Sequence, residues 1–330
     1  MNGENEQDEL NGIIAATAFD LEREVTGRNS CEAPTMEGKA EEVETEHEYR
    51  QWSSHDKRMF RPASKSYPVL SPGFYEICHT NSIGVYFQLL DTSSESLIRF
   101  KDINIDKVIC DIEKFWTREK VFRDFSLTFK RGILLWGPQG TGKTCTVRLV
   151  MEDVIRRGGV VIKFDHPKIF SLGMVIFRSI QPKTPCVVLL EDIDAIISHY
   201  SESDVINILD GVERIDNTVF IATTNYPERL GARIVNRPSR FDRRYKIGNL
   251  NEESRKVYFN HLMSITPELL KKHDVDKWAR DTDGFSISHL KELFVSVVIL
   301  DDPYDSSLAV LKKMRDNLST SGDAKLGFGK

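Results

Sequence analysis

Residues 137–144 read GPQGTGKT and fit the pattern G-x-x-x-x-G-K-[ST]. Glycines in such a loop let consecutive backbone N–H groups point inward, where they can surround phosphate oxygens. The apolar run GILLW at 132–136 predicts a strand before the loop, and the residues after it predict an amphipathic helix that ends near Gly158. The N-terminus of that helix adds partial positive charge to the loop. The stretch therefore predicts a phosphate-binding loop between a strand and a helix.

A nucleotide is the ligand that we expect at this loop. Lys143 is placed to reach the β- and γ-phosphates, and the hydroxyl of Thr144 is placed to ligate Mg²⁺. A chance match in an ordinary turn is the alternative, and the flanking strand and helix argue against it. Cys145 could be an oxidisable thiol, although simple packing of a small residue is the favoured interpretation. The expected binding residues are Gly137, Pro138, Gln139, Gly140, Thr141, Gly142, Lys143, Thr144 and Cys145.

The run VVLLEDID at 187–194 is the second candidate site. Its apolar residues predict a buried strand, and Glu191, Asp192 and Asp194 follow that strand. Carboxylates at a strand end can coordinate a metal and polarise a water molecule. Taken alone, the run is equally consistent with a buried strand that ends in a solvated acidic turn. Beside a phosphate-binding loop, the catalytic interpretation is favoured.

Strand and helix patterns alternate over residues 104–248, which is typical of a parallel α/β sheet and predicts a nucleotide-binding domain there. Residues 249–318 contain helical patterns only and predict a small all-α lid domain. In residues 53–103 the β-favouring runs FYEI, VYFQLL and SLIRF predict a linker and a small β-rich module. We expect a disordered acidic arm over residues 1–52 and a flexible tail over 319–330. The predicted strands of the α/β domain are 132–136, 160–164, 187–191, 219–223 and 244–247.

Charge is distributed unevenly along the 330 residues. Residues 1–50 contain 14 Asp and Glu against 4 Lys and Arg, a net charge of −10, so the total of −5 leaves +5 for the remainder. That modest excess, without a basic cluster interleaved with aromatic residues, argues against a nucleic-acid partner. No apolar run approaches the roughly 18–20 residues of a membrane span, and five scattered cysteines indicate a reducing compartment. We therefore expect a cytoplasmic protein.

Further motifs resemble those of the AAA+ ATPase family. VFIATTNYPERL at 219–230 is similar to the family's sensor-1 strand, which implies that Asn225 lies beside the attacking water. GARIVNRPSRFDRRYKIG at 231–248 resembles the family's arginine-finger region, with Arg237 and Arg240 at the two finger positions. NEESRKVYF and TDGFSISHLKELF resemble parts of the helical lid. The resemblance covers about residues 110–318.

This resemblance implies an α/β P-loop sheet with a helical lid, and an enzyme that binds ATP and Mg²⁺ and hydrolyses the ATP. It implies that Thr144 and Glu191 hold the metal and that Asp192 polarises the water or acts as the base. It also implies a homo-oligomeric ring of six that remodels a protein substrate or works with an adaptor. A slow nucleotide-dependent switch or scaffold, which recruits a partner through its N-terminal region, is the alternative.

Some features depart from the family's usual pattern. The order Glu191-Asp192 replaces the common Asp-Glu, as it does in the similar mitochondrial complex-III assembly AAA proteins. The aromatic–hydrophobic–glycine pore loop is matched only loosely, and Phe170 fits a core position as well as a substrate contact. The N-terminal adenine-pocket motif is missing. In the lid, Ser288 stands where the family has a small residue, so no sensor-2 arginine is expected there.

Overall fold

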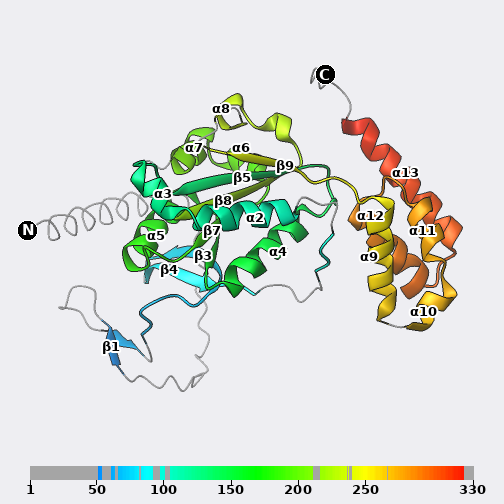
Figure 1. Cartoon of the computed structure of the whole chain (residues 1–330), viewed down its shortest axis with the longest axis horizontal. Coiled ribbons are helices and arrows are strands. Elements are labelled where there is room, and N and C mark those ends of the chain that lie inside the picture. The colour runs from blue at the N-terminus through cyan, green and yellow to red at the C-terminus, as the bar shows by residue number, and fades with distance from the viewer. Residues whose placement is uncertain are drawn as a thin grey trace, which may run out of the picture.

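A computed structural model describes residues 51–53, 61–63, 66–81, 83–91, 97–100, 105–210, 216–235, 237, 240–265 and 267–322. The acidic arm expected over 1–52 lies outside these ranges up to residue 50, and the tail expected over 319–330 lies outside them from residue 323 on. The last helix nevertheless continues to Gly322, past the predicted lid boundary at residue 318. Figure 1 shows an α/β part that carries the sheet and a helical part that follows it at the end of the last strand.

A seven-stranded sheet forms the centre of the α/β part, in the order β4-β3-β6-β7-β8-β5-β9. Its neighbours pair in parallel, except for the antiparallel hairpin of β3 and β4. The five strands predicted for the α/β domain are confirmed, each within two residues of its expected bounds. The strands are β3 Gly73–Thr80, β4 Gly84–Leu89, β5 Lys130–Trp136, β6 Val160–Lys163, β7 Cys186–Leu190, β8 Thr218–Thr224 and β9 Arg243–Lys246. A separate hairpin pairs β1 Gln51–Ser53 with β2 Arg61–Ala63.

The β3–β4 hairpin is part of the main sheet, whereas the sequence suggested a module of its own. β3 pairs in parallel with β6, and its residues Tyr75 and Ile77 are buried in the core. Gly173 makes this possible, because a Cβ there would lie 2.4 Å from the Ile77 side chain. The run SLIRF forms no strand over its described residues 97–100. Instead, Ile98 and Phe100 pack against the hydrophobic cluster of the helical part.

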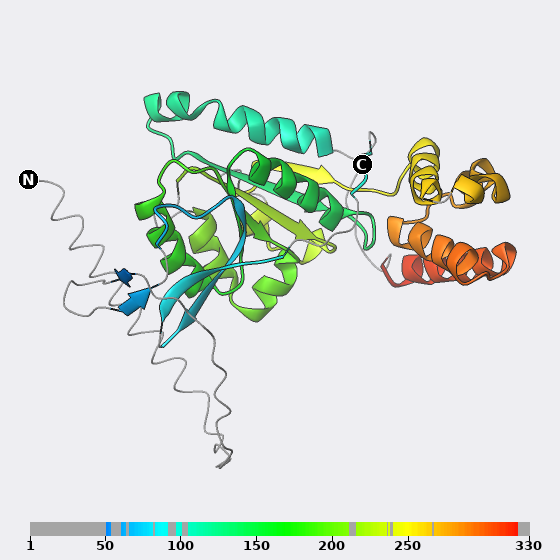
Figure 2. The ribbon, with the colours of Figure 1, turned by 90° about the horizontal axis from the view of Figure 1, so that it is seen from below.

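Helices cover both faces of the sheet (Figure 2). On one face, α2 and α4 pack with the strands over a cluster that includes Ile133, Val161 and Leu189. On the other face, α5, α6 and α7 enclose a second cluster, which includes Ile162 and Val188. Successive strand residues point to opposite faces, so each buried strand contributes to both clusters. The helices of this part are α2 Ile105–Trp116, α3 Glu119–Asp124, α4 Lys143–Arg156, α5 Pro167–Ile180, α6 Ile193–His199, α7 Glu202–Asp210, the 3₁₀ turn η1 Pro227–Arg229 and α8 Ala232–Val235.

The helical part after β9 confirms the predicted all-α character of that region. Its helices are α9 Glu252–Ser264, α10 Pro267–Lys272, α11 Val275–Asp281, α12 Ile287–Phe294, the π-helical turn η2 Val295–Ile299 and α13 Tyr304–Gly322. Leu290, Leu293 and Val297 are buried in one cluster with Phe259 and Trp278. We call residues 249–322 the lid. Among the described residues, no helix is both long enough and apolar enough to cross a membrane.

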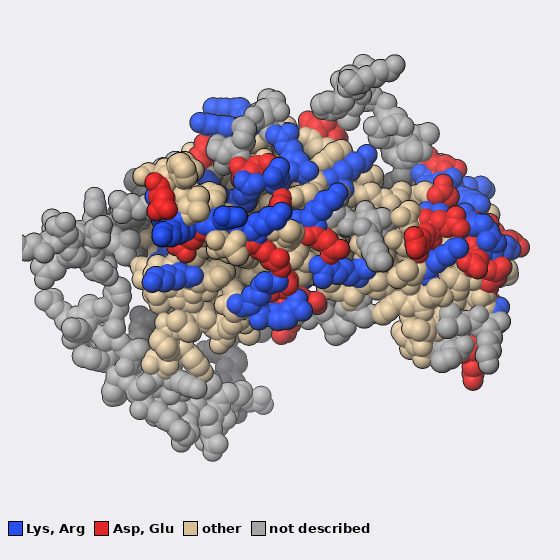
Figure 3. Space-filling model, in the orientation of Figure 1, with Lys and Arg blue, Asp and Glu red and all other residues tan. Residues whose placement is uncertain are grey.

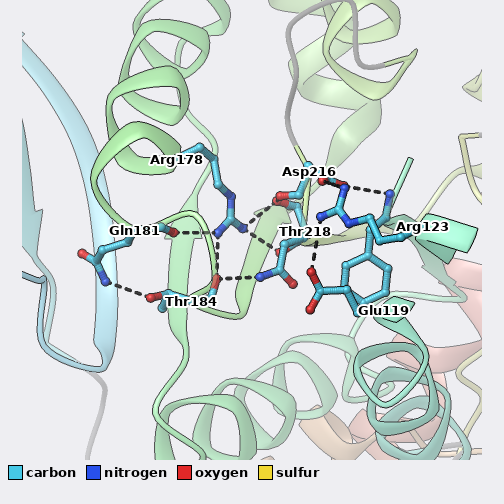
Figure 4. Close-up of polar contacts among 9 residues, drawn as sticks. Glu119, Arg123, Arg178, Gln181, Thr184, Asp216 and Thr218 are labelled. Carbon is cyan, nitrogen blue, oxygen red and sulfur yellow. Dashed lines mark hydrogen bonds and ion pairs between the residues drawn. The ribbon is translucent and has the colours of Figure 1, made fainter. Parts of the chain in front are cut away.

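A half-buried arginine, Arg178, ties the end of α5 to the starts of two central strands (Figure 4). The Arg178 guanidinium donates to the carbonyls of Gln181 at 3.3 Å, Thr184 at 2.7 Å and Asn217 at 2.6 Å, and to the hydroxyl of Thr218 at 2.9 Å. These acceptors belong to the loops that enter β7 and β8. The arginine therefore connects the amino-terminal ends of β7 and β8, at the end of the sheet opposite to the phosphate-binding loop.

Several charged side chains on the surface of the α/β part have an oppositely charged partner within the described chain. Figure 3 shows Lys and Arg side chains interspersed with Asp and Glu over the face that carries α2 and α4. Arg157 lies 2.7 Å from Asp153, and Arg243 lies 3.3 Å from Asp111. Exposed ion pairs of this kind contribute about 0–1 kcal/mol each to the free energy of unfolding, so they have little effect on the stability of the fold.

Candidate nucleotide-binding site

The loop between β5 and α4 has the glycine geometry of a phosphate-binding loop. Gly137 has φ 156°, and a Cβ there would lie 2.0 Å from the carbonyl oxygen of Ile247. Gly140 has φ 73°, and a Cβ there would lie 2.8 Å from the hydroxyl oxygens of Ser286 and Ser288 in the lid. Neither position can hold a larger residue without movement of its neighbours. The lid also contacts the loop directly, since the Ser288 N–H donates to the Gly140 carbonyl at 3.3 Å.

Lys143 lies inside this loop at the first position of α4. Its Nζ donates to the carbonyls of Gly137 at 2.8 Å and Pro138 at 2.7 Å. Burial lowers the pKa of the Lys143 ammonium, while the carboxylates of Asp192 and Asp194 act in the opposite direction. The next residue, Thr144, lines the cavity that is described below. The cation is thus held at the centre of the loop by carbonyl oxygens that a phosphate could replace.

The two strand-end carboxylates follow β7 directly. Asp192 adopts a left-handed backbone conformation, φ 48° and ψ 55°, at the N-terminal end of α6. Its N–H donates to the Thr223 hydroxyl at 3.0 Å, and its Oδ1 accepts from Asn225 Nδ2 at 3.2 Å. The ends of β7 and β8 are therefore joined through Asp192. This contact brings two predicted site residues, Asp192 and Asn225, within hydrogen-bond distance of each other.

Glu191 stands in a mixed electrostatic environment. Glu191 is exposed at the mouth of the site, but partial desolvation by the surrounding protein raises the pKa of its carboxyl group, and the negative charge of Asp192 raises it further. The positive charges of Arg148 on α4 and Lys163 on β6 act in the opposite direction. Asp194, two residues beyond Asp192, accepts a hydrogen bond from the Thr224 hydroxyl at 2.7 Å. Carboxylates, hydroxyls and an amide thus meet at the carboxyl ends of adjacent parallel strands.

These groups line one cavity of about 280 Å³ between the sheet, the loop and the lid. Its lining residues are Gln139, Gly140, Gly142, Lys143, Thr144, Cys145, Glu191, Asp192, Thr223, Asn225, Ile287 and Ser288. The sequence did not identify Thr223 or Ile287 as site residues. Thr223 could have been found from its place at the end of β8, two residues before the expected site residue Asn225. Ile287 belongs to the lid, and only its fold brings it to the loop.

The donors in this cavity fit a magnesium–nucleotide complex. Mg²⁺ in such sites takes one or two protein oxygens and completes its shell with phosphates and water. Thr144, Glu191 and Asp192 provide a hydroxyl and two carboxylates beside the loop. Within the described part of the chain, no group of three or more His, Cys, Asp or Glu residues could hold a metal by itself. A metal at this site would therefore depend on a ligand for the rest of its coordination.

Arg237 and Arg240 do not line this cavity. Arg240 is 4% exposed, and its guanidinium donates to both carboxylate oxygens of Asp210 at 2.8 Å and 2.7 Å. Arg237 is 62% exposed and lies 3.3 Å from the same carboxylate. Asp210 ends α7. The two arginines thus share one acid on a different part of the domain.

Phe170, the loosely matched pore-loop residue, is a core residue. It lies in α5, is 1% exposed, and its ring centroid is 5.0 Å from that of Phe164. Its side chain therefore belongs to the cluster between the sheet and α5.

Comparison with known proteins extends these observations. Residues 133–249 match the model of the ATPase family associated with various cellular activities (AAA). The chain is 24% identical over 280 residues to a probable 26S proteasome regulatory subunit 10B of Caenorhabditis elegans, an alignment that covers 78% of this chain and 65% of the relative. It is 27% identical over 208 residues to an ATP-dependent zinc metalloprotease of Conexibacter woesei, covering 58% and 32%.

A third relative is a cell division cycle protein 48 homolog of Archaeoglobus fulgidus. It is 28% identical over 186 residues, which cover 51% of this chain and 25% of the relative. The chain therefore spans between a quarter and two thirds of the length of these relatives.

Proposed function

We propose that this chain, which carries a domain of the AAA ATPase family, binds ATP with Mg²⁺ and hydrolyses the ATP to ADP and phosphate. One observation carries the proposal: the loop lysine, the two strand-end carboxylates and Asn225 line a single cavity. Each of these groups has a distinct task in phosphoryl transfer, which needs positioning and charge stabilisation more than covalent chemistry. The names of the relatives, a proteasome regulatory subunit and an ATP-dependent metalloprotease among them, support this reaction.

The loop residues hold the phosphates in this proposal. Backbone N–H groups of Gly140 and Gly142 contact phosphate oxygens, and Lys143 exchanges its carbonyl partners for the β- and γ-phosphates. The charged oxygens are stronger acceptors than the carbonyls of Gly137 and Pro138, so the exchange is favourable. Thr144 and Glu191 would hold a magnesium ion, which would neutralise charge on the phosphates.

Asp192 and Asn225 handle the attacking water in the same proposal. The Asp192 carboxylate accepts a proton or polarises the water, and the Asn225 amide orients it from the neighbouring strand. The order Glu-Asp puts the shorter carboxylate in this role. The left-handed backbone of Asp192 and its contact with Thr223 fix where that shorter side chain begins.

Lys143→Ala tests the binding half of the proposal. We expect ATP affinity to fall about tenfold or more, because the change removes the cation that meets the β- and γ-phosphates. The measurement is a titration with a fluorescent ATP analogue. Lys256→Ala in the lid is the matched control, since it also removes a lysine with a carboxylate partner, Asp276 at 2.9 Å. Affinity retained within about threefold in Lys143→Ala would contradict the loop assignment.

We further propose a head-to-tail ring of subunits, of six as in similar AAA+ proteins, that remodels a protein partner. Arg237 lies outside its own cavity, which supports a role at the cavity of a neighbouring subunit. Head-to-tail contacts close into rings when the rotation between subunits permits it.

A slow nucleotide-dependent switch or scaffold is the second candidate function. The burial of Phe170 favours it, because that side chain cannot grip a polypeptide from the core. Steady-state phosphate release separates the two functions. Turnover near about 1 s⁻¹ supports the remodelling ATPase, whereas about one event per hour supports the switch.

A further inference from the structure

Three residues of alternating charge, Glu76, Lys163 and Glu191, belong to two adjacent strands and to the turn that follows a third. Glu76 on β3 pairs in register with Lys163 on β6, and Lys163 pairs in register with Leu189 on β7. Glu191 follows Leu189 by two residues. Glu191 lies one residue beyond the end of β7, so it is a diagonal neighbour of Lys163 rather than its partner in register, and we call Glu76, Lys163 and Glu191 the row.

The packing of neighbouring residues identifies this face. Phe74, Val161 and Leu189 each precede a member of the row by two residues and belong to the cluster beneath α2 and α4. Glu76 and Lys163 therefore lie on the side of α4, the helix that begins at the phosphate-binding loop, and the charge of Arg148 on that helix acts on the Glu191 carboxylate. The row runs from the edge hairpin to the nucleotide cavity, whose lining includes Glu191.

Within the row, Glu76 and Lys163 are in direct contact. Lys163 Nζ lies 2.8 Å from Glu76 Oε1, and the Glu76 side chain is 22% exposed. The hydrogen bond that Lys163 donates to the Glu76 carboxylate raises the pKa of the Lys163 ammonium, and the charges of Asp165 and Glu191 add to this. Lys163 is thus paired directly with one carboxylate, and its charge also acts on a second, Glu191. One carboxylate holds it, and the other lines the cavity.

We propose that Lys163 is a positioning residue for Glu191 and that Glu76 of the β3–β4 hairpin holds Lys163 in place. The inference rests on the proposed function, in which Glu191 is a magnesium ligand. Glu191 and Asp192 are adjacent carboxylates that repel each other, so a fixed cation on the far side of Glu191 favours one orientation of its side chain. Glu76 lies in the hairpin, which precedes the region that matches the AAA family. In this proposal, a residue outside the matched region therefore helps to position the metal-binding carboxylate.

A purely structural role for the ion pair is the competing explanation. In that case Glu76 and Lys163 only hold the hairpin on the sheet, and their loss lowers stability without an effect on metal affinity. The Mg²⁺ dependence of nucleotide binding separates the two roles, because binding measured in EDTA reports the loop alone.

The experiment compares Lys163→Met, Lys163→Arg and Glu76→Gln with the wild-type chain. A fluorescent ATP analogue is titrated at fixed Mg²⁺ concentrations and in EDTA, and melting temperatures are recorded for each variant. Lys256→Met is the matched control, since it removes a similar ion pair with Asp276 in the lid.

We expect Lys163→Met to raise the Mg²⁺ concentration at half-saturation about two- to fivefold, the range of exposed charge pairs. Binding in EDTA and the Lys256→Met control stay unchanged. Lys163→Arg restores the wild-type value, and Glu76→Gln shifts it in the same direction as Lys163→Met by a smaller factor.

A Lys163→Met variant with an unchanged Mg²⁺ half-saturation would overturn the inference, whatever its melting temperature. Equal loss of binding with and without Mg²⁺ would also overturn it, because the effect would then be structural. A wild-type chain that binds no nucleotide would instead overturn the proposed function, and this inference with it.

Discussion

Asp192 combines a special backbone position with the proposed chemical role. Its φ of 48° lies in the left-handed region, which side chains other than Gly, Asn and Asp adopt at a cost. An alanine there would add strain to the loss of the carboxylate, so its effect on activity would have two causes. Asparagine tolerates the conformation and keeps an oxygen that can accept from Asn225. Asp192→Asn therefore isolates the charge.

We expect Asp192→Asn to reduce hydrolysis about a hundredfold or more while ATP affinity stays within about threefold of the wild type, since a general base contributes on that scale. Glu191→Gln has the complementary effect, a weaker Mg²⁺-dependent binding. Single-turnover hydrolysis and nucleotide titration of both variants measure the difference. If Glu191→Gln leaves the Mg²⁺ dependence of binding intact, the roles proposed for the two carboxylates are wrong. If neither variant slows turnover, the proposal that the residues after β7 are catalytic is wrong.

Sequence reasoning found the cavity residues that lie within local motifs. The phosphate-binding loop and the acidic strand end are each continuous in sequence, and parallel strands bring their carboxyl ends together without further information. Ile287 lines the same cavity from the lid, about 140 residues beyond the loop, within the stretch TDGFSISHLKELF that resembles the family's lid. The resemblance marks the segment, and only the fold shows which of its residues reaches the cavity. The pairing of Arg240 with Asp210 could not be predicted either, because nothing in the sequence distinguishes Asp210 from other residues at the end of a helix.

At the scale of elements, buried strands were predictable and the sheet edge was not. A run of four or five consecutive apolar residues indicates a strand that is buried on both faces, here between two layers of helices. The strands β5 to β8 could therefore be predicted from their apolar runs. The hairpin β3–β4 was recognised as a hairpin, but its pairing with β6 depends on backbone hydrogen bonds that carry no sequence signal. The run SLIRF shows the opposite case, since Ile98 and Phe100 are apolar because they pack on the lid.

Arg178 joins elements through the backbone, and its loss is predicted to destabilise the fold. Arg178→Met keeps the apolar stem but leaves the carbonyls of Gln181, Thr184 and Asn217 without this donor. Each buried acceptor left unsatisfied costs about 1–3 kcal/mol, and partial compensation makes about 2–4 kcal/mol the expected loss of unfolding free energy.

Urea denaturation checks this prediction, with Arg156→Met as the matched control. Arg156 is 72% exposed and pairs with Asp153 on its own helix, so its replacement is expected to cost less than about 0.5 kcal/mol. Similar urea midpoints for the two variants would show that the Arg178 contacts contribute little to stability.

At the scale of the whole molecule, the two finger-position arginines have different surroundings and are expected to differ in function. Arg240 is buried against Asp210, and the hydrogen bond from Arg240 lowers the pKa of that carboxyl group. Arg240→Ala would leave Asp210 without its main partner, so a loss of activity would follow from damage to the fold. Arg237 is exposed and touches Asp210 at 3.3 Å only, so it can be removed at little cost to stability.

Arg237 is therefore the residue that tests whether one subunit completes the site of another. Its guanidinium lies outside its own nucleotide cavity, and a planar fork of donors suits the oxygens of a phosphoryl group on a neighbour. We expect Arg237→Ala to assemble normally and to lose about 10³-fold or more in hydrolysis, as for arginines supplied in trans. Lys143→Ala is inactive for a different reason, since it lacks the loop cation but keeps Arg237.

Mixing the two inactive variants then restores part of the activity. In a mixed ring, some interfaces present the intact Arg237 of a Lys143→Ala subunit to the intact loop of an Arg237→Ala subunit, and each such interface is complete. Phosphate release is measured across mixing ratios, with light scattering to verify co-assembly and melting temperatures to verify folding. No recovery in co-assembled rings would contradict the trans role. Full activity of Arg237→Ala alone would remove the arginine from catalysis, because a group that stabilises the transferring phosphoryl cannot be deleted without a change in rate.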